Sequence, residues 1–191
     1  MKQTAIVIAA GGEARRMGGG KPLRSLAGMR LIDRALAFGR RQGGPVAVAA
    51  NASLPGVDVA HLPDQTPGIG PISALASGMG FAAAQGCDTL LMIGCDMPFL
   101  PDDLLPRLAT ALPGHGAALP ESGGRLHPMA GLWRVAVPAV ADYIGGGGQS
   151  LWGFAERQGM VRVAWPDGPF ANINSPADLA AAEARLTAPA R

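Results

Sequence analysis

The chain has 191 residues, of which 48% are hydrophobic and 16% charged, a balance that excludes a disordered chain and allows one sizeable core. The formal net charge is only +2, and the basic residues form no long run, so bulk charge gives no support to nucleic-acid binding. Two cysteines are too few for a disulfide framework, and no apolar stretch approaches the roughly 20 residues of a membrane span. We therefore expect a cytoplasmic protein with a single domain over residues 1–191 that binds neither nucleic acid nor a membrane.

The first two thirds of the chain alternate between strand-like and helix-like patterns. The continuous apolar run 4–10 predicts a buried strand, and further strands are predicted at 45–51 and, again buried, at 88–96. A short strand that runs into a loop is predicted at 57–64. Apolar residues at helical spacing predict helices through 32–39, 72–83 and 105–112. Asp102 and Asp103 are expected in the first turn of the last of these helices, where the helix dipole favours negative charge. The alternation predicts the α/β class, as a Rossmann-like three-layer fold with a mostly parallel sheet and helices on both faces.

The last third of the chain is less regular. A strand is predicted within 126–135, followed by a helix toward Tyr143. The glycine-rich stretch at 145–150 is expected to be a loop before another short helix. A final helix is predicted after Ser175, which suits the N-cap, with Pro176 at the first helical position.

Each of the four predicted strands is followed by a polar group. The glycine-rich segment 11–21 follows the first strand, and Asn51, Asp64 and Asp96 stand at or after the ends of the next three. In an open parallel sheet, ligands bind at the carboxyl ends of the strands. Each residue alone could be an ordinary turn residue. Their joint placement favours a binding site at one edge of the sheet.

The segment 11–21 combines glycines with basic side chains. Glycine lets the backbone approach a phosphate closely, and successive N–H groups can surround an anion. Arg16 and Lys21 add positive charge that suits a polyphosphate, whereas Arg15 could equally be a solvated surface residue. The segment is therefore predicted to bind phosphate.

Two familiar phosphate-binding motifs are excluded for this segment. A Walker A loop needs Ser or Thr after its lysine, and here Pro22 follows Lys21. The dinucleotide fingerprint G-x-G-x-x-G is not supplied by Gly11-Gly12-Glu13. The segment must belong to another kind of phosphate loop.

The stretch "AAGGEARRMGGGKP" resembles the signature of the nucleotidyltransferases that activate sugars and cofactors with a nucleoside triphosphate. Within that superfamily the chain resembles the molybdenum cofactor guanylyltransferase family. The resemblance extends over almost the whole chain and is carried by "GGEARRMGGGK" (11–21), Asn51, "PGIGPISAL" (67–75), "CDMPFLPDDL" (95–104), "HPMAGLW" (127–133) and "NINSPADL" (172–179). The chain departs from that family's usual pattern at Gly20, where relatives commonly place an aspartate, so a carboxylate that could position Lys21 is missing from the loop.

The resemblance implies a nucleotidyltransferase fold and a role for each matching position. Ala9, Ala10, Gly11, Gly12 and Lys21 would contact the triphosphate and nucleoside, Asn51 and Asp64 would hold the guanosine, Asp96 would bind Mg²⁺, and Asn172 and Asn174 would meet the pterin substrate or complete the metal site. Residues 1–105 would form the nucleotide-binding part and residues 106–191 the part that binds the cofactor substrate.

The implied reaction transfers GMP from Mg·GTP to the terminal phosphate of a molybdopterin-type cofactor, giving the guanine dinucleotide and pyrophosphate. Such a transfer needs in-line geometry, a hard cation and positive charge at the leaving group. Lys21 and Arg16 meet the demand for charge, and Asp96 meets the demand of Mg²⁺ for one or two carboxylates. The attacking phosphate is already anionic, so no histidine base is required. His127 is expected to be structural, with a substrate contact as the alternative.

Other functions stay open on the sequence alone. A cytidylyltransferase for the same cofactor is the nearest alternative, although such relatives tend to carry aspartates where this chain has Asn172 and Asn174. A sugar-phosphate nucleotidyltransferase and a non-catalytic nucleotide-binding regulator are the others. The presence of both Lys21 and Asp96 argues against lost catalysis. Protein partners that deliver the cofactor or accept the product are also expected for this family.

Overall fold

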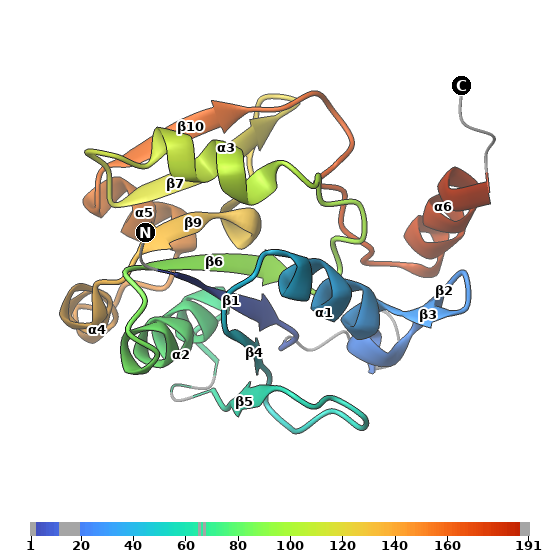
Figure 1. Cartoon of the computed structure of the whole chain (residues 1–191), viewed down its shortest axis with the longest axis horizontal. Helices are drawn as coiled ribbons and strands as arrows, with labels where there is room; N and C mark the ends of the chain where they lie inside the picture. The colour runs from blue at the N-terminus through green and yellow to red at the C-terminus, as the bar shows by residue number, and fades with distance from the viewer. Residues whose placement is uncertain (1–2, 12–19, 65, 67, 188–191) are drawn as a thin grey trace.

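The computed structural model describes residues 3–11, 20–64, 66 and 68–187. Its main sheet follows the strand order β10-β7-β9-β6-β1-β4-β5, with β8 paired to β7 outside this path (Figure 1). The bounds of these strands are β1 Thr4–Ala9, β4 Val46–Ala49, β5 Ala60–Leu62, β6 Thr89–Gly94, β7 Ala117–Ser122, β8 Arg125–Leu126, β9 Leu132–Arg134 and β10 Met160–Ala164.

The centre of the sheet is parallel. β1 pairs in parallel with β4 and β6, and β4 with β5, while β9 runs antiparallel between β6 and β7. Ala9 is opposite Ala49 on one side and Gly94 on the other, so β1, β4 and β6 end at the same edge. The polar groups that follow these strands are therefore brought together, as expected for an open parallel sheet.

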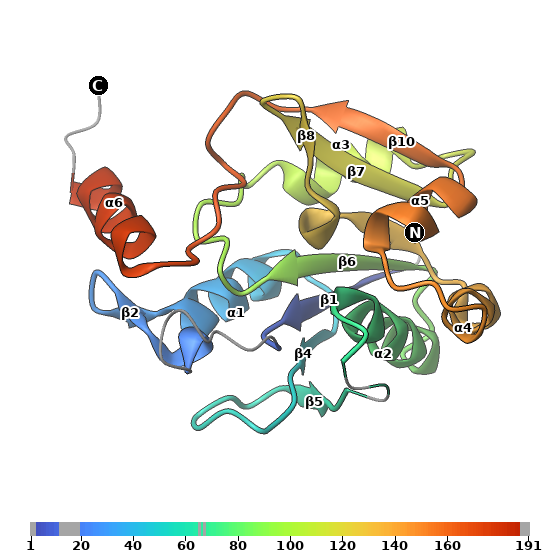
Figure 2. The same cartoon turned by 180° about the vertical axis from the view of Figure 1, so that it is seen from behind.

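Helices cover both faces of the sheet, which confirms the predicted α/β class with a mostly parallel sheet. The helices are α1 Leu31–Arg41, α2 Pro71–Ala84, α3 Leu104–Ala111, α4 Val137–Gly145, α5 Leu151–Arg157 and α6 Pro176–Thr187. α1 and α3 pack against one face, and α2, α4 and α5 against the other (Figures 1 and 2).

The alternation along β1 explains why its sequence is apolar after Thr4. Ile6 and Ile8 belong to the hydrophobic cluster under α1 and α3, whereas Ala5 and Val7 belong to the cluster under α2 and α4. All four residues have no exposed surface. A strand buried on both faces needs apolar side chains at every position.

The last helix stands apart from these three layers. α6 packs beside the hairpin formed by β2 (Ser25–Leu26) and β3 (Met29–Arg30), as both views show. A small separate cluster holds this corner together: Leu26, Leu31, Ile173 and Ala182. The predicted cap is present, because the amide of Asp178 donates to Oγ of Ser175 at 3.1 Å.

The expectation for Asp102 and Asp103 is wrong. α3 begins at Leu104 with no acidic residue in its first turn, and Asp103 is the N-cap residue without a side-chain capping bond. Both carboxylates have other partners. Arg41 donates to Asp102 at 3.1 Å, and Nε1 of Trp165 donates to Asp103 at 3.2 Å.

The segment 126–135 is not one continuous strand. It divides into the end of β8, a 3-10 turn η3 (Pro128–Ala130) and β9. Pro128 has no N–H to donate to a ladder, and the amide of Ala130 turns back to the carbonyl of His127 at 2.9 Å. β7 and β10 lie outside the strands predicted from the sequence. Among the described helices, none is both long and apolar enough to cross a bilayer.

Gly44 offers a test of how the turn after α1 packs on β1. A Cβ at this position would lie 1.8 Å from the carbonyl oxygen of Thr4. We expect Gly44→Ala to lower the free energy of unfolding by about 1–3 kcal/mol or more, because the backbone must shift. Gly80, in α2, has nothing within 4 Å of such a Cβ. Gly80→Ala should raise the free energy by about 0.5–1 kcal/mol. Urea denaturation measures both, and equal midpoints for Gly44→Ala and the parent would contradict the contact.

Candidate functional site

The first cavity, called cavity 1 here, lies at the ends of β1 and β4 and has a volume of about 430 Å³. Small residues line its base, among them Ala9, Gly11, Ala49 and Ala50. Four predicted binding residues line it together: Ala9, Gly11, Asn51 and Asp64. The small side chains leave room for a ligand to approach the backbone closely.

Two polar side chains flank cavity 1. Oδ1 of Asp64 accepts from the amide of Thr66 at 3.1 Å and from the hydroxyl of Ser73 in α2. Both bonds use the same oxygen, so the carboxylate is held in place while Oδ2 keeps its accepting capacity. The amide group of Asn51 lies near Gly11, where a Cβ would come within 3.9 Å of Oδ1.

The other predicted nucleotide residues are placed differently. Ala10 is 8% exposed, belongs to the core under α1, and donates its amide to the carbonyl of Ala49 at 2.8 Å. It is not among the residues that line cavity 1. Gly12, Arg15 and Arg16 lie outside the described residues, so their predicted roles stay predictions.

Lys21 forms an ion pair with Asp96. Its Nζ donates to Oδ2 of Asp96 at 2.6 Å and to Oδ1 of Asn174 at 2.8 Å. The side chains of Lys21 and Asp96 are 17% and 19% exposed. Lys21 opens the 3-10 turn η2 (Lys21–Leu23) after Gly20, whose φ is 65°. In the absence of a carboxylate at position 20, Asp96 and Asn174 position the lysine.

Hydrogen bonds from backbone amides hold the segments of Asp96 and Asn174 in place. The amide of Ile173 donates to the carbonyl of Asp96 at 2.9 Å. The amide of Asn174 donates to Oδ2 of Asp178 at 2.9 Å. That bond is the main cause that lowers the pKa of Asp178, with Ser175 adding to it. The amide of Cys95 donates to the carbonyl of Ala9 at 3.0 Å, which ties the ion pair to the edge of cavity 1.

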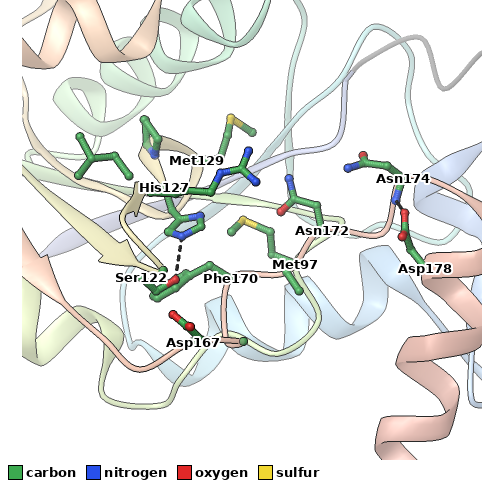
Figure 3. Close-up of a pocket in the computed structure, with 15 residues that line it drawn as sticks. Met97, Ser122, His127, Met129, Asp167, Phe170, Asn172, Asn174 and Asp178 are labelled. Atoms are coloured by element: carbon green, nitrogen blue, oxygen red, sulfur yellow. Dashed lines mark hydrogen bonds between the residues drawn. The ribbon is translucent and has the colours of Figure 1, made fainter.

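The second cavity, called cavity 2, is lined in part by Asn174, which accepts from Lys21, and measures about 540 Å³. Its lining comes from the segment after β6, the β7–β8 hairpin, η3 and the segment before α6, as Figure 3 shows. Asn172 and Asn174, both predicted to meet the second substrate, line it. Met129 lines both cavities, so the two lie next to each other.

His127 has a defined environment in cavity 2. Its Nε2 lies 2.9 Å from Oγ of Ser122, and its ring stacks on Phe170 with centroids 4.8 Å apart. Burial is the main cause that lowers its pKa, and the positive charge of Arg125 acts in the same direction. The imidazole is therefore neutral at neutral pH.

Several residues of cavity 2 are not among those predicted from the sequence. Arg125 and Asp167 line it, yet neither stands at a predicted strand end or in a recognised motif. The adjacent Gly123 and Gly124, with φ of 56° and 70°, were the available signal for a tight β7–β8 hairpin. Ser122 and Phe170 could not be linked to His127 without the fold.

The residues present suit Mg²⁺ only together with a substrate. Among the described residues, no group of three or more His, Cys, Asp or Glu side chains could hold a metal ion. Asp96 offers a carboxylate, and Asn174 offers an amide oxygen beside it. Mg²⁺ in phosphate-transfer sites commonly takes one or two carboxylates and completes its shell with phosphate oxygens and water. The donor set fits that pattern.

A mostly parallel sheet with helices on both faces, and with cavities and charged groups at its strand ends, defines an α/β protein of the nucleotide-binding class. Residues 6–161 match the MobA-like NTP transferase domain family, and the chain belongs to that family. It is therefore an enzyme of the nucleotidyltransferase class.

Individual relatives extend this match. The chain is 42% identical over 190 residues to the molybdenum cofactor guanylyltransferase of Cereibacter sphaeroides, covering 94% of this chain and 95% of that protein. It is 41% identical over 193 residues to the protein of that name from Rhodobacter capsulatus, with the same coverage of 94% and 95%. These relatives confirm the predicted resemblance.

Solved structures agree on the fold. The molybdopterin-guanine dinucleotide biosynthesis protein A of Archaeoglobus fulgidus has a TM-score of 0.76 at 22% identity, over 96% of this chain and 99% of that one. The 2-C-methyl-D-erythritol 4-phosphate cytidylyltransferase of Thermus thermophilus has a TM-score of 0.69 at 19% identity, over 98% and 100%. At these identities the likeness establishes the fold alone.

Cys95, next to Asp96, should be an inert thiol. Burial, and secondarily the charge of Asp96, raises the pKa of Cys95 to about 12. We expect the native protein at pH 8 to react with a thiol reagent at Cys95 on the order of 1,000-fold more slowly than a free cysteine. After denaturation in guanidinium both cysteines should react. The variant Cys95→Ser shows which part of the labelling comes from Cys95. Rapid labelling of the native protein that is lost in this variant would contradict the burial of the thiol.

Proposed function

We propose that the chain is a molybdenum cofactor guanylyltransferase, which transfers GMP from Mg·GTP to the terminal phosphate of molybdopterin and releases pyrophosphate. The observation that carries the proposal is the junction of Lys21, Asp96 and Asn174, because Asn174 lines cavity 2 and the amide of Cys95, next to Asp96, bonds Ala9 at the edge of cavity 1. A group-transfer enzyme needs two substrates on either side of one reaction centre. The names of relatives at 41–42% identity support the same reaction.

GTP would occupy cavity 1. The small residues Ala9 and Gly11 leave space for the backbone to approach the nucleotide. Asn51 and Asp64 would hold the guanosine, since Oδ2 of Asp64 remains able to accept a hydrogen bond from a base N–H or a ribose hydroxyl. Gly12 would contribute backbone to the phosphates, and Ala10 would act through its support of the strand end.

Lys21 would stabilise negative charge on the phosphates. An ammonium group has three donors, and two of them are directed to Asp96 and Asn174. The third can donate to a phosphate oxygen without loss of the other two. Arg16 would add a second positive charge at the leaving pyrophosphate.

Asp96, with Asn174 beside it, would hold Mg²⁺ together with oxygens of the triphosphate. The ion would supply charge neutralisation and would orient the phosphate for in-line attack. Asn172 and Asn174 would bring the acceptor to the same point, because both line cavity 2. The acceptor phosphate is already anionic, so no side chain has to remove a proton from it.

The two cavities support a division of labour along the chain. Apart from Met129, the residues of cavity 1 come from the part before residue 105, whereas those of cavity 2 extend from Met97 to Asp178. We infer a nucleotide part at about 1–105 and an acceptor part at about 106–191. A cytoplasmic location and partners that deliver the cofactor or accept the product belong to the same proposal.

A cytidylyltransferase acting on the same cofactor is the alternative. Asn172 and Asn174 favour guanine, since related cytidylyltransferases tend to carry aspartates there. Two further carboxylates beside Asp96 would also change the charge of the metal site.

Pyrophosphate release with each of the four nucleoside triphosphates, Mg²⁺ and molybdopterin tests the proposal. We expect release with GTP well above that with CTP. Asp96→Asn and Lys21→Met should each lower kcat/KM by about 100-fold or more, because each removes charge from the transition state. Asp142→Asn, on the exposed side of α4, is the matched control and should retain activity. No release by the parent protein would contradict the proposal, and a preference for CTP would favour the alternative.

A further inference from the structure

Some polar side chains of cavity 2 form hydrogen bonds within the protein, and others do not. Asp178 accepts from the amide of Asn174, and Asn174 accepts from Lys21. Within the described part of the chain, in contrast, no hydrogen bond or ion pair engages the side chains of Asp167 or Arg125. Both line the same cavity and do not pair with each other. Both residues are exposed to solvent, so their charges are available to a ligand that enters the cavity.

Asp167 lies at one end of cavity 2. Its Oδ1 lies so close to the β7–β8 turn that a Cβ on Gly123 would come within 3.1 Å of it. Gly123 has a φ of 56°, which favours glycine. Asn174, which bonds Lys21, lies at the other side of the cavity from Asp167, as Figure 3 shows. The cavity therefore has a carboxylate at one end and the reaction centre at the other.

His127 also lines cavity 2, and its ring is fixed in orientation. Oγ of Ser122 hydrogen-bonds with Nε2, and the ring stacks on Phe170. Phe170 in turn packs edge-on against Trp165, with the two ring centroids 5.6 Å apart. Nε1 of Trp165 donates to Asp103, so the aromatic series is anchored to the segment before α3. In Figure 3 the other ring nitrogen of His127 is directed toward the side of the cavity where Met97 and Asn172 lie.

The chemistry of these groups describes a ligand. A phosphate must lie at the Asn174 end for attack on the nucleotide. A carboxylate such as Asp167 pairs well with adjacent N–H donors, as in a cyclic amidine or guanidine edge. A fixed imidazole and the two thioethers of Met97 and Met129 form walls that suit a flat ring. A phosphorylated heterocycle with an N–H-rich edge fits all of these.

We propose, on the basis of the proposed function, that Asp167 and His127 select the acceptor by its heterocycle. Asp167 accepts hydrogen bonds from the exocyclic amino group and the neighbouring ring N–H of a pterin-type ring. Nδ1 of His127 hydrogen-bonds the ring between that edge and the phosphate. Arg125 contributes positive charge that attracts the anionic acceptor into the cavity. Asp167 and His127 are specificity-determining residues, separate from Lys21 and Asp96.

Direct binding of pterin and of lumazine, which has an oxygen in place of the 2-amino group, tests the assignment of Asp167. The parent protein should bind pterin roughly 10-fold more tightly than lumazine, followed by ligand fluorescence at saturating GTP. Asp167→Asn should abolish that preference, and the matched variant Asp142→Asn should retain it. Equal binding of the two rings by the parent, or an unchanged preference in Asp167→Asn, would overturn the proposal.

Steady-state kinetics with molybdopterin separate this inference from the proposed function. Asp167→Asn should raise the KM for the acceptor by roughly 10- to 100-fold and leave the KM for GTP unchanged. His127→Phe, which keeps an aromatic ring on Phe170 and removes both nitrogens, should raise the acceptor KM alone by about threefold to tenfold. His115→Gln is the control for the histidine. An active parent whose variants keep the acceptor KM would overturn the inference alone. A parent that prefers pterin yet releases no pyrophosphate would overturn the proposed function alone.

Discussion

The ion pair between Lys21 and Asp96 is the contact on which the site depends. It joins a loop that follows β1 to the end of β6, and Asn174 adds the segment before α6. The two charged side chains are less than one fifth exposed, so their attraction is screened less than that of a surface pair. Removal of either partner would leave a largely buried charge without its counter-ion, which costs more than the pair itself contributes. The lysine and the aspartate therefore hold each other in place.

The small corner formed by α6 and the β2–β3 hairpin gives this junction its support. Leu26 follows the turn that carries Lys21, and Ile173 directly precedes Asn174. Both side chains are buried in the same separate cluster, at 0% and 2% exposure. Burial of these apolar side chains thus holds together two segments that are distant in sequence. Lys21 and Asn174, which belong to these segments, then meet beside Asp96. The cluster explains why a helix outside the three layers matters to the site.

The parts of the fold that could be predicted are those in which burial dictates every residue. The stretches 5–10 and 90–93 are apolar at every position because β1 and β6 are covered on both faces. β7 and β10 could not be found in this way. β7 contains Pro120 and Glu121 near its end, and β10 is a short edge strand with exposed residues such as Arg162. Their pairing is decided by neighbours distant in sequence.

The two halves of the candidate site differ in how far the sequence predicts them. Asn51, Asp64 and Asp96 follow parallel strands, so topology alone gathers them at one edge. Asp167 and His127 come from irregular segments, and their meeting depends on the β7–β8 turn and on the stack with Phe170. No hydrophobic periodicity in the sequence predicts such contacts.

Because Lys21 lacks a carboxylate at position 20 and relies on Asp96, the carboxylate that would hold the metal also holds the lysine. In the proposed function, nucleotide and metal would therefore both adjust this one charge pair, which would couple their binding.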